Sequence, residues 1–561
     1  MAKTVGIGIQ EFGKIIENNC FYVDKTPFIK EWWESEDDVT LIARPRRFGK
    51  TLNMSMLEHF FSVKYADRGD LFEDLFIWKE ERYRNLQGTY PVIFLSFADV
   101  KDRTYKDCVY NICTILKNMY ADYVFLKDAG VLSEAEIAYY NQMEMKVRLE
   151  DAPKAIQQLS KFLCRYYGKK VIILLDEYDT PMQEAYVGGF WDELSLFIRS
   201  LFNAAFKTNP YMARAVMTGI TRVSKESIFS DLNNLKVVTT TSDEYAAAFG
   251  FTEEEVFKVL DEYGYGEQKG KVKWWYDGFI FGKYKDIYNP WSIINFLDTG
   301  KIATYWANSS SNSLVGKLIR EGNRNIKITF EKLLKGENIC CPIDEEIVYN
   351  QLDDNEAAIW SLLLASGYLK VIDYEEKTIA GQDVLYDLTL TNAEVEDMFY
   401  GMVRRWFGKA RADYNDFVKA MLSGDVEEMN EYMECVTEQI YSCFDAGTKP
   451  SKSQPERFYH GFVLGLIVDL SDRYVITSNR ESGFGRYDVV IEPKDKGDDA
   501  IILEFKVFNS RKETSLEDTV ESALTQIDEK NYAASLIARG ISAEHIRKYG
   551  FAFEGKKVLI G

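Results

Sequence analysis

Runs of apolar residues in the N-terminal half of the chain predict a parallel β-sheet. Four such runs follow one another, each long enough for one strand: Val39 to Ala43, Pro91 to Phe97, Val171 to Leu175 and Ala213 to Met217. A strand that is apolar throughout, with no regular polar positions, is typical of a parallel sheet covered by helices on both faces. We therefore expect an α/β fold in this half.

A different pattern, hydrophobic alternation, marks a strand near the other end of the chain. In residues 501–508 every second side chain is apolar, and Glu504 and Lys506 lie together on the opposite face. Asp488 belongs to a short apolar run that an acidic turn separates from this strand. Two antiparallel strands joined by that turn would bring Asp488 beside Glu504. Such carboxylates repel each other unless they share a cation, and hard oxygen ligands suit Mg²⁺ or Mn²⁺. Lys506 would then orient the attacking water or steady a phosphate.

The first apolar run of the N-terminal half leads into a candidate phosphate-binding loop. The segment ends in Gly49-Lys50-Thr51, where a helix is expected to begin. In loops of this kind, backbone N–H groups surround the phosphates, the lysine reaches the outer phosphates and the threonine hydroxyl helps to hold Mg²⁺. Arg44 stands where the first glycine of the usual pattern belongs. We expect the following residues to contact the nucleotide: Arg46, Arg47, Phe48, Gly49, Lys50 and Thr51.

Polar residues at the ends of two other predicted strands complete this site. Asp176 and Glu177 follow the apolar run 171–175, and ligands bind at the carboxyl ends of parallel strands. Asp176 would hold Mg²⁺ together with Thr51, and Glu177 would activate the hydrolytic water. Thr218 ends the run 213–217 and would sense the terminal phosphate. Arg222 is a candidate charge-stabilising arginine, with a helix-capping or salt-bridged role as the alternative.

The chain resembles the AAA-ATPase-like family, which commonly carries a C-terminal PD-(D/E)XK nuclease domain. The segments LIARPRRFGKTLNMSML, LLDEYDTP, TGITRVSKESIFSDLNNL and YWANSSSN carry the first resemblance, over roughly residues 5–320. The family reads RPRRFGK[ST] at the loop, so the resemblance makes Arg44 a family trait. The order Glu456, Asp488, Glu504-x-Lys506, Gln526 resembles the nuclease superfamily. This resemblance implies that Glu456 on a first helix completes the acidic shell and that Gln526 on a later helix supports the site.

Composition and charge limit the remaining choices. No apolar run approaches the eighteen or so residues of a membrane-spanning helix, and the eight Cys and three His show no zinc-ligand spacing. We expect a cytoplasmic protein that does not associate with membranes; homo-oligomerisation stays open. The formal net charge of −20 repels a phosphate backbone at long range, so nucleic acid would have to bind in a local groove.

The two predicted enzymatic parts are separated by a helical region. We expect an α/β multidomain fold: an AAA-like P-loop domain with a parallel sheet at 1–250, a helical lid at 251–340, a winged-helix-like and helical connector at 341–445, and a PD-(D/E)XK nuclease-like α/β domain at 446–561. The wing tip would lie at Ala380–Gln382. Its candidate recognition helix, WSLLLASGY, has no Lys or Arg, which favours packing over DNA reading.

Three functions fit this organisation. The first is an ATP-binding and ATP-hydrolysing protein coupled to a metal-dependent nuclease that acts on nucleic acid, DNA in preference to RNA. The second is a regulatory NTPase switch whose nuclease-like domain binds nucleic acid or protein without cutting; the complete Glu/Asp/Glu/Lys set argues against it. The third is a scaffold that binds ATP without turnover; the Asp176–Glu177 pair argues against it.

Overall fold

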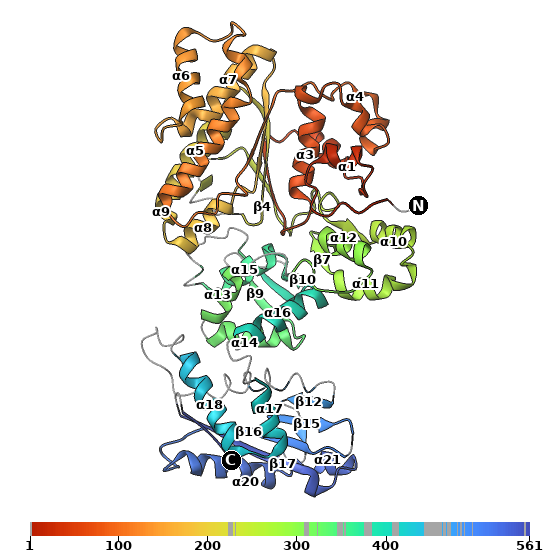
Figure 1. The fold of residues 1–561 in the computed structure, drawn as a ribbon, viewed down its shortest axis with the longest axis vertical. Helices are drawn as coiled ribbons and strands as arrows, with labels where there is room; N and C mark the ends of the chain where they lie inside the picture. Colours follow the sequence, from red (N-terminus) through yellow and green to blue (C-terminus); the bar gives the residue numbers. More distant parts are fainter. Residues whose placement is uncertain are drawn as a thin grey trace. The chain divides into compact units, whose positions relative to one another are not determined.

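The chain forms two compact units. Residues 1–320 and 332–398 make up the first unit, and residues 321–331 and 399–561 make up the second. The computed structural model of this protein (Figure 1) describes residues 3–222, 228–229, 232–307, 313–321, 324–344, 352, 355–374, 384–406, 414–441, 463, 467, 470, 473–478, 481–482, 485–486, 488–495, 497–554 and 557–561.

The first unit is built on a five-stranded parallel sheet. Its strand order is β2 (Val92–Ser96), β3 (Val171–Asp176), β4 (Met212–Gly219), β1 (Val39–Ala43) and β5 (Leu235–Val238). Each of the four apolar runs forms one of these strands, which confirms the prediction of a parallel sheet; β5 was not expected. Every residue of β1 and β3 is buried.

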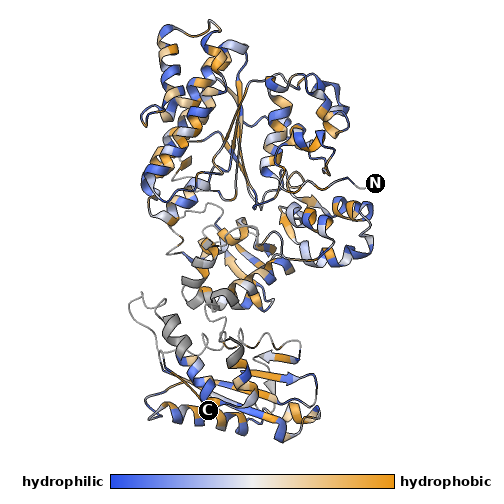
Figure 2. Cartoon of the chain, in the orientation of Figure 1, coloured by the Kyte–Doolittle hydropathy of each residue, from blue (hydrophilic) through white to orange (hydrophobic). Residues whose placement is uncertain are grey.

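Helices cover both faces of this sheet, which explains why its strands are apolar throughout. In Figure 1, α5 (Tyr105–Ala121), α7 (Ala155–Tyr167) and α9 (Trp191–Phe202) lie on one side of the sheet. The helices α1 (Phe12–Glu17) and α3 (Lys50–Phe61) lie on the other side. The strands are mostly apolar along their length, whereas the helices carry polar and apolar positions side by side (Figure 2). Burying each large apolar side chain contributes about 1.5–3 kcal/mol to folding.

The region after the sheet, predicted as a helical lid, contains short strands as well as helices. Three helices, α10 (Glu253–Glu262), α11 (Lys269–Tyr276) and α12 (Pro290–Thr299), pack with a small antiparallel sheet of β6 (Phe251–Thr252), β8 (Tyr284–Tyr288) and β7 (Phe279–Phe281). Thr252 and Glu255 form a capping box that starts α10, and the Asn289 side chain caps α12. The aromatic residues of this region, such as Tyr276, Tyr288 and Phe296, form its core.

A second small sheet follows within the first unit. Its order is β10 (Leu369–Tyr374), β11 (Leu385–Leu390) and β9 (Ile339–Pro342), all antiparallel, with α15 (Glu356–Ala365) between β9 and β10 and α16 (Ala393–Trp406) after β11. In the sequence, β9 is preceded by α13 (Ser313–Glu321) and α14 (Arg324–Leu334), and residues 324–331 of α14 belong to the second unit. Most of α15 is buried, from Ala358 to Leu364, so its apolar sequence reflects packing. The proposed wing tip at 380–382 lies outside the described residues.

The second unit is a mixed sheet covered on both faces. Its order is β12 (Tyr474–Ser478), β15 (Val489–Pro493), β16 (Ala500–Val507), β17 (Ile546–Glu554) and β18 (Lys557–Ile560), and only the β16–β17 pair is parallel. A separate short hairpin joins β13 (Glu481–Ser482) to β14 (Gly485–Arg486). One face packs on α17 (Tyr414–Ser423) and α18 (Val426–Tyr441), through Phe417, Met433 and Phe551 among others. On the other face, Ile502 packs with Ile527 of α20 (Leu516–Glu529) and Leu536 of α21 (Ala534–Ala538).

Candidate nucleotide and metal sites

The segment from Arg44 to Thr51, called the GKT loop below, connects β1 to α3. Gly49 has φ of 82° and Arg47 has φ of 66°, a left-handed conformation that glycine adopts freely and arginine rarely does. Lys50 begins α3 and is buried, and its Nζ donates to the carbonyl oxygens of Arg44 and Pro45, both at 3.1 Å. The lysine therefore lies within the curve of the loop.

The buried side chain of Arg44 anchors the start of the GKT loop. The guanidinium is fully buried, donates to the carbonyl oxygens of Thr239 and Glu244, and lies 4.5 Å from the centre of the Phe281 ring. Burial lowers the pKa of Arg44 to about 9. The arginine at this position therefore does not occupy the space inside the loop, because its guanidinium is buried against Thr239, Glu244 and Phe281.

The other side chains of the GKT loop have protein partners. Arg46 donates to the Gln183 side chain at 3.2 Å, and the Arg47 guanidinium lies 4.2 Å from the centre of the Trp291 ring. Phe48 is buried against Phe279 and Phe281, at 4.8 Å and 5.4 Å between ring centres. Because the Phe48 side chain is buried, a ligand could contact this residue only through its backbone.

Asp176 brings two of the predicted residues together at the end of β3. Its carboxylate accepts a hydrogen bond from the Thr51 hydroxyl at 2.7 Å and another from the Thr218 hydroxyl. Burial, and then the charge of Glu177, raise the pKa of Asp176. A buried carboxylate with two hydroxyl groups is an all-oxygen donor set, which fits Mg²⁺.

Glu177 lies on the same side as Lys50. Its carboxylate is 3.6 Å from Lys50 Nζ, and its backbone has φ of 53°. This left-handed conformation is uncommon for glutamate and often marks functional positions. Arg222 lines a small cavity together with Thr239, Thr241 and Ser361.

Asp179 was missed by the sequence predictions. It is buried, and one carboxylate oxygen accepts from the N–H groups of Ile220 and Thr221 at 2.9 Å and 2.8 Å and from the Thr221 hydroxyl at 2.9 Å. Gly219 passes so close that a Cβ there would meet Asp179 at 2.7 Å. Asp179 thus fixes the segment after Thr218. The second aspartate in DEYD was its only sequence signal.

The second unit brings the predicted nuclease carboxylates onto neighbouring strands. Val489 of β15 pairs with Leu503 of β16, so Asp488 stands next to Glu504 in the antiparallel register. Asp488 also accepts a hydrogen bond from the Phe505 N–H at 2.9 Å. Glu504 is buried, and burial together with the charge of Asp488 raises its pKa to about 8.

Helix α20 supplies partners for the two polar residues of β16. Gln526 donates to Glu504 Oε1 and, at 3.2 Å, to the Tyr532 hydroxyl. Lys506 Nζ donates to the Ser522 hydroxyl at 2.9 Å and to the Ser522 carbonyl at 3.0 Å. Within the described residues, Glu504 Oε2 is buried without a hydrogen-bond partner. This orphaned oxygen beside Asp488 fits a divalent cation, which would favour the charged carboxylate.

Ser522 and Tyr532 were not predicted as site residues. Ser522 lies one helical turn before Gln526, so both face β16; that spacing is the only sequence signal for it. The remaining predicted residue, Glu456, lies outside the described residues.

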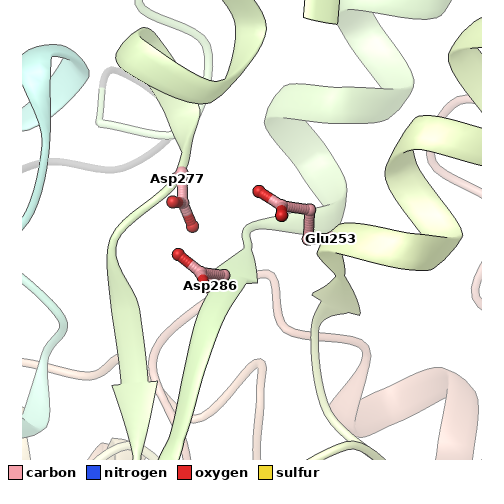
Figure 3. Close-up of side chains that lie close together, drawn as sticks. All are labelled: Glu253, Asp277 and Asp286. Carbon is pink, nitrogen blue, oxygen red and sulfur yellow. The ribbon is translucent and has the colours of Figure 1, made fainter. Parts of the chain in front are cut away.

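Three acidic side chains also lie together in the first unit, far in sequence from either set. Oxygens of Glu253, Asp277 and Asp286 lie within 4.8 Å of one another (Figure 3). Lys273 forms an ion pair with each of them, at 3.9 Å from Asp277 and 3.4 Å from Asp286. Burial and a hydrogen bond with Asp286 raise the pKa of Asp277 to about 7. We assign this cluster to charge balance around Lys273.

The fold and the two sets of polar residues define a protein with an ATPase-like unit and a nuclease-like unit. Family comparisons agree. Residues 6–229 match the AAA-ATPase-like family, described as "Predicted AAA-ATPase", and residues 454–561 match the PD-(D/E)XK nuclease superfamily. The chain therefore contains an AAA-ATPase-like domain and a PD-(D/E)XK nuclease superfamily domain. It is also similar to an "Uncharacterized protein in vnfD 5'region" of Azotobacter chroococcum mcd 1, with 24% identity over 397 residues, 70% of this chain and 68% of that protein. No helix in the described part of the chain has the length and apolar character needed to cross a membrane.

Proposed function

We propose that this protein binds and hydrolyses ATP in its first unit and cleaves nucleic acid, preferably DNA, in its second unit with the help of Mg²⁺ or Mn²⁺. The observation that carries the proposal is the buried Glu504 carboxylate, which stands next to Asp488, keeps one oxygen without a partner and is held by Gln526. Without a bound cation, the negative charge of this buried carboxylate would have no compensating partner.

In the first unit, Thr51 and Asp176 would hold Mg²⁺, which neutralises phosphate charge when bound. Lys50 would leave the carbonyl groups of Arg44 and Pro45 to meet the outer phosphates. Glu177 would then be released from Lys50 and accept the proton of the attacking water. Thr218 would donate to the terminal phosphate or continue to hold Asp176.

In the second unit, Asp488 and Glu504 would hold the cation, which polarises the scissile phosphodiester when bound. Lys506 would orient the attacking water or neutralise the phosphate, while Ser522 fixes the position of its amine. Gln526 would keep Glu504 in one orientation. Glu456 would complete the acidic shell, as the superfamily resemblance implies.

One observation favours the alternative of a regulatory NTPase with a non-cutting nuclease-like unit. Among the described residues, both hydrogen bonds of the Lys506 amine go to Ser522, and a lysine that never leaves this residue would not reach a phosphate. In that case the second unit would bind nucleic acid or protein without cleavage.

A substrate panel tests the proposal. Purified full-length protein is incubated with linear, circular and single-stranded DNA and with RNA, with and without ATP and Mg²⁺, and Lys50→Ala is carried in parallel. We expect Mg²⁺-dependent cleavage in the wild type and ATP binding that Lys50→Ala weakens at least tenfold, the scale of a lost charge-assisted hydrogen bond. Binding of substrate without cleavage under every condition would favour the regulatory alternative.

A further inference from the structure

The GKT loop is held from outside by backbone and side-chain N–H groups of the region that follows the sheet. The Arg46 carbonyl accepts from Trp306 Nε1 at 2.9 Å and from Asn289 Nδ2 at 3.3 Å. Two residues later, the Phe48 carbonyl accepts a hydrogen bond from the Gly250 N–H at 3.2 Å. Two alternate carbonyl groups of the loop are therefore turned toward residues 250–306.

This arrangement determines where the loop N–H groups point. In a trans peptide the carbonyl and the following N–H face opposite directions, so the N–H groups of Arg47 and Gly49 face away from residues 250–306. Both residues have positive φ, at 66° and 82°. Within the described part of the chain, neither N–H has a hydrogen-bond partner. Unpaired N–H groups on one side of a curved loop form a nest that suits an anion.

Trp306 is itself held firmly. Its backbone N–H donates to Glu394 at 2.6 Å, and its ring packs against Phe279 and Tyr368 at 5.3 Å and 5.5 Å between ring centres. Asn289 is fully buried and caps α12, with its Oδ1 accepting from the N–H groups of Trp291 and Ser292. Rigid donors of this kind preserve the orientation of the peptide that they hold.

We propose that Trp306 and Asn289 are positioning residues for nucleotide binding: their side-chain N–H groups hold the Arg46 carbonyl outward and so aim the Arg47 N–H at a bound phosphate. Neither side chain touches the nucleotide in this scheme. The inference rests on the proposed function, because it requires that the GKT loop binds ATP. It also gives a role to the YNPW and YWAN segments, which lie far from the loop in sequence.

The test uses substitutions that remove one N–H group and little else. Trp306→Phe keeps an aromatic ring and loses the indole donor, and Asn289→Ser loses the amide donor and keeps a residue able to cap α12. Trp275→Phe is the matched control, because its indole donates to the Ala303 carbonyl at 3.3 Å in the same region without touching the loop. ATP affinity is measured by calorimetry on the full-length chain, with KM and kcat for hydrolysis and with thermal unfolding as a folding check.

We expect Trp306→Phe and Asn289→Ser each to weaken ATP binding and raise KM about fivefold to tenfold, with kcat changed by less than twofold. The double variant should be weaker than either single variant, and Trp275→Phe should bind like the wild type. Wild-type affinity in both single variants, or an equal loss in Trp275→Phe, would overturn the positioning role. Absence of ATP binding by the wild type would instead overturn the proposed function.

Discussion

At the scale of single residues, the first unit contains a carboxylate that is buried among uncharged donors. Glu394 accepts from the Ser292 hydroxyl at 2.8 Å and from the backbone N–H of Trp306. Burial raises its pKa to about 7, and the hydrogen bonds only partly offset this effect. The protonated form is therefore favoured in the folded state relative to the unfolded chain.

The raised pKa of Glu394 predicts a pH dependence of stability. The folded-state pKa of Glu394 lies above its unfolded value. Its contribution to the free energy of unfolding is therefore fully present below about pH 4.3 and is lost as the pH rises through about 7. Between these limits the group should remove on the order of 3 kcal/mol from the free energy of unfolding. Urea unfolding at several pH values measures it. Glu394→Gln, which does not titrate, should show a shallower fall than the wild type, and identical slopes would contradict the prediction.

Single residues also show the limit of the sequence predictions. Thr51, Asp176 and Thr218 are joined by hydrogen bonds, and each of the three positions carries a strand or loop signal in the sequence. Glu504 was expected on a polar strand face, yet it is buried, since that face is covered by α20. Alternation along a strand reveals which residues share a face, but not what covers the face.

At the scale of elements, helix α20 and strand β16 act as a pair. Ser522 and Gln526 are one turn apart on the helix, Lys506 and Glu504 are two residues apart on the strand, and each helix residue binds one strand residue. The helix therefore sets the orientation of both of these polar side chains of β16.

This pairing predicts the effect of Ser522→Ala. The variant removes one of the two hydrogen bonds that hold the Lys506 amine, so nuclease kcat should fall roughly tenfold while the affinity for Mg²⁺ stays constant. Cleavage kinetics at saturating Mg²⁺ measure this, with Ser522→Thr expected to restore the rate. Ser535→Ala, a half-buried serine of the neighbouring helix α21, serves as the control. An unchanged kcat in Ser522→Ala would show that the amine needs no anchor at this residue.

Long, uniformly apolar elements were the ones that the sequence predicted well. The strands β1 and β3 stand out because every residue is buried, whereas β6 to β8 have few residues and partly exposed ones, so their pattern resembles that of connecting loops. The donors that hold the GKT loop could not be predicted, because no local pattern shows that an indole at position 306 will reach a carbonyl at position 46.

At the scale of the whole molecule, the two candidate sites belong to different compact units. Thr51, Asp176 and Thr218 lie within the first unit, and Asp488, Glu504 and Lys506 lie within the second. No described side chain belongs to both sets, so the chemistry of one site should not require the residues of the other.

This separation predicts the behaviour of metal-site variants. Asp488→Ala and Glu504→Ala should each abolish DNA cleavage, and the double variant should lose no more, because two ligands of one cation act as a unit. ATP hydrolysis should stay within twofold of the wild type in all three. Parallel phosphate-release and cleavage assays on each variant measure both activities. A large loss of ATP hydrolysis in Asp488→Ala would show that the sites are chemically linked.

The side chain of Arg44 also bears on the order in which the chain folds. The carbonyl groups that receive its guanidinium come from Thr239 and Glu244, 195 and 200 residues further along. Contacts this distant in sequence form late, because the intervening chain must first be ordered. During synthesis, the GKT loop would emerge from the ribosome near the start, yet the buried arginine would lack its acceptors until residue 244 had followed. The loop that looks most local in the sequence would thus be among the last parts of the first unit to reach its final shape.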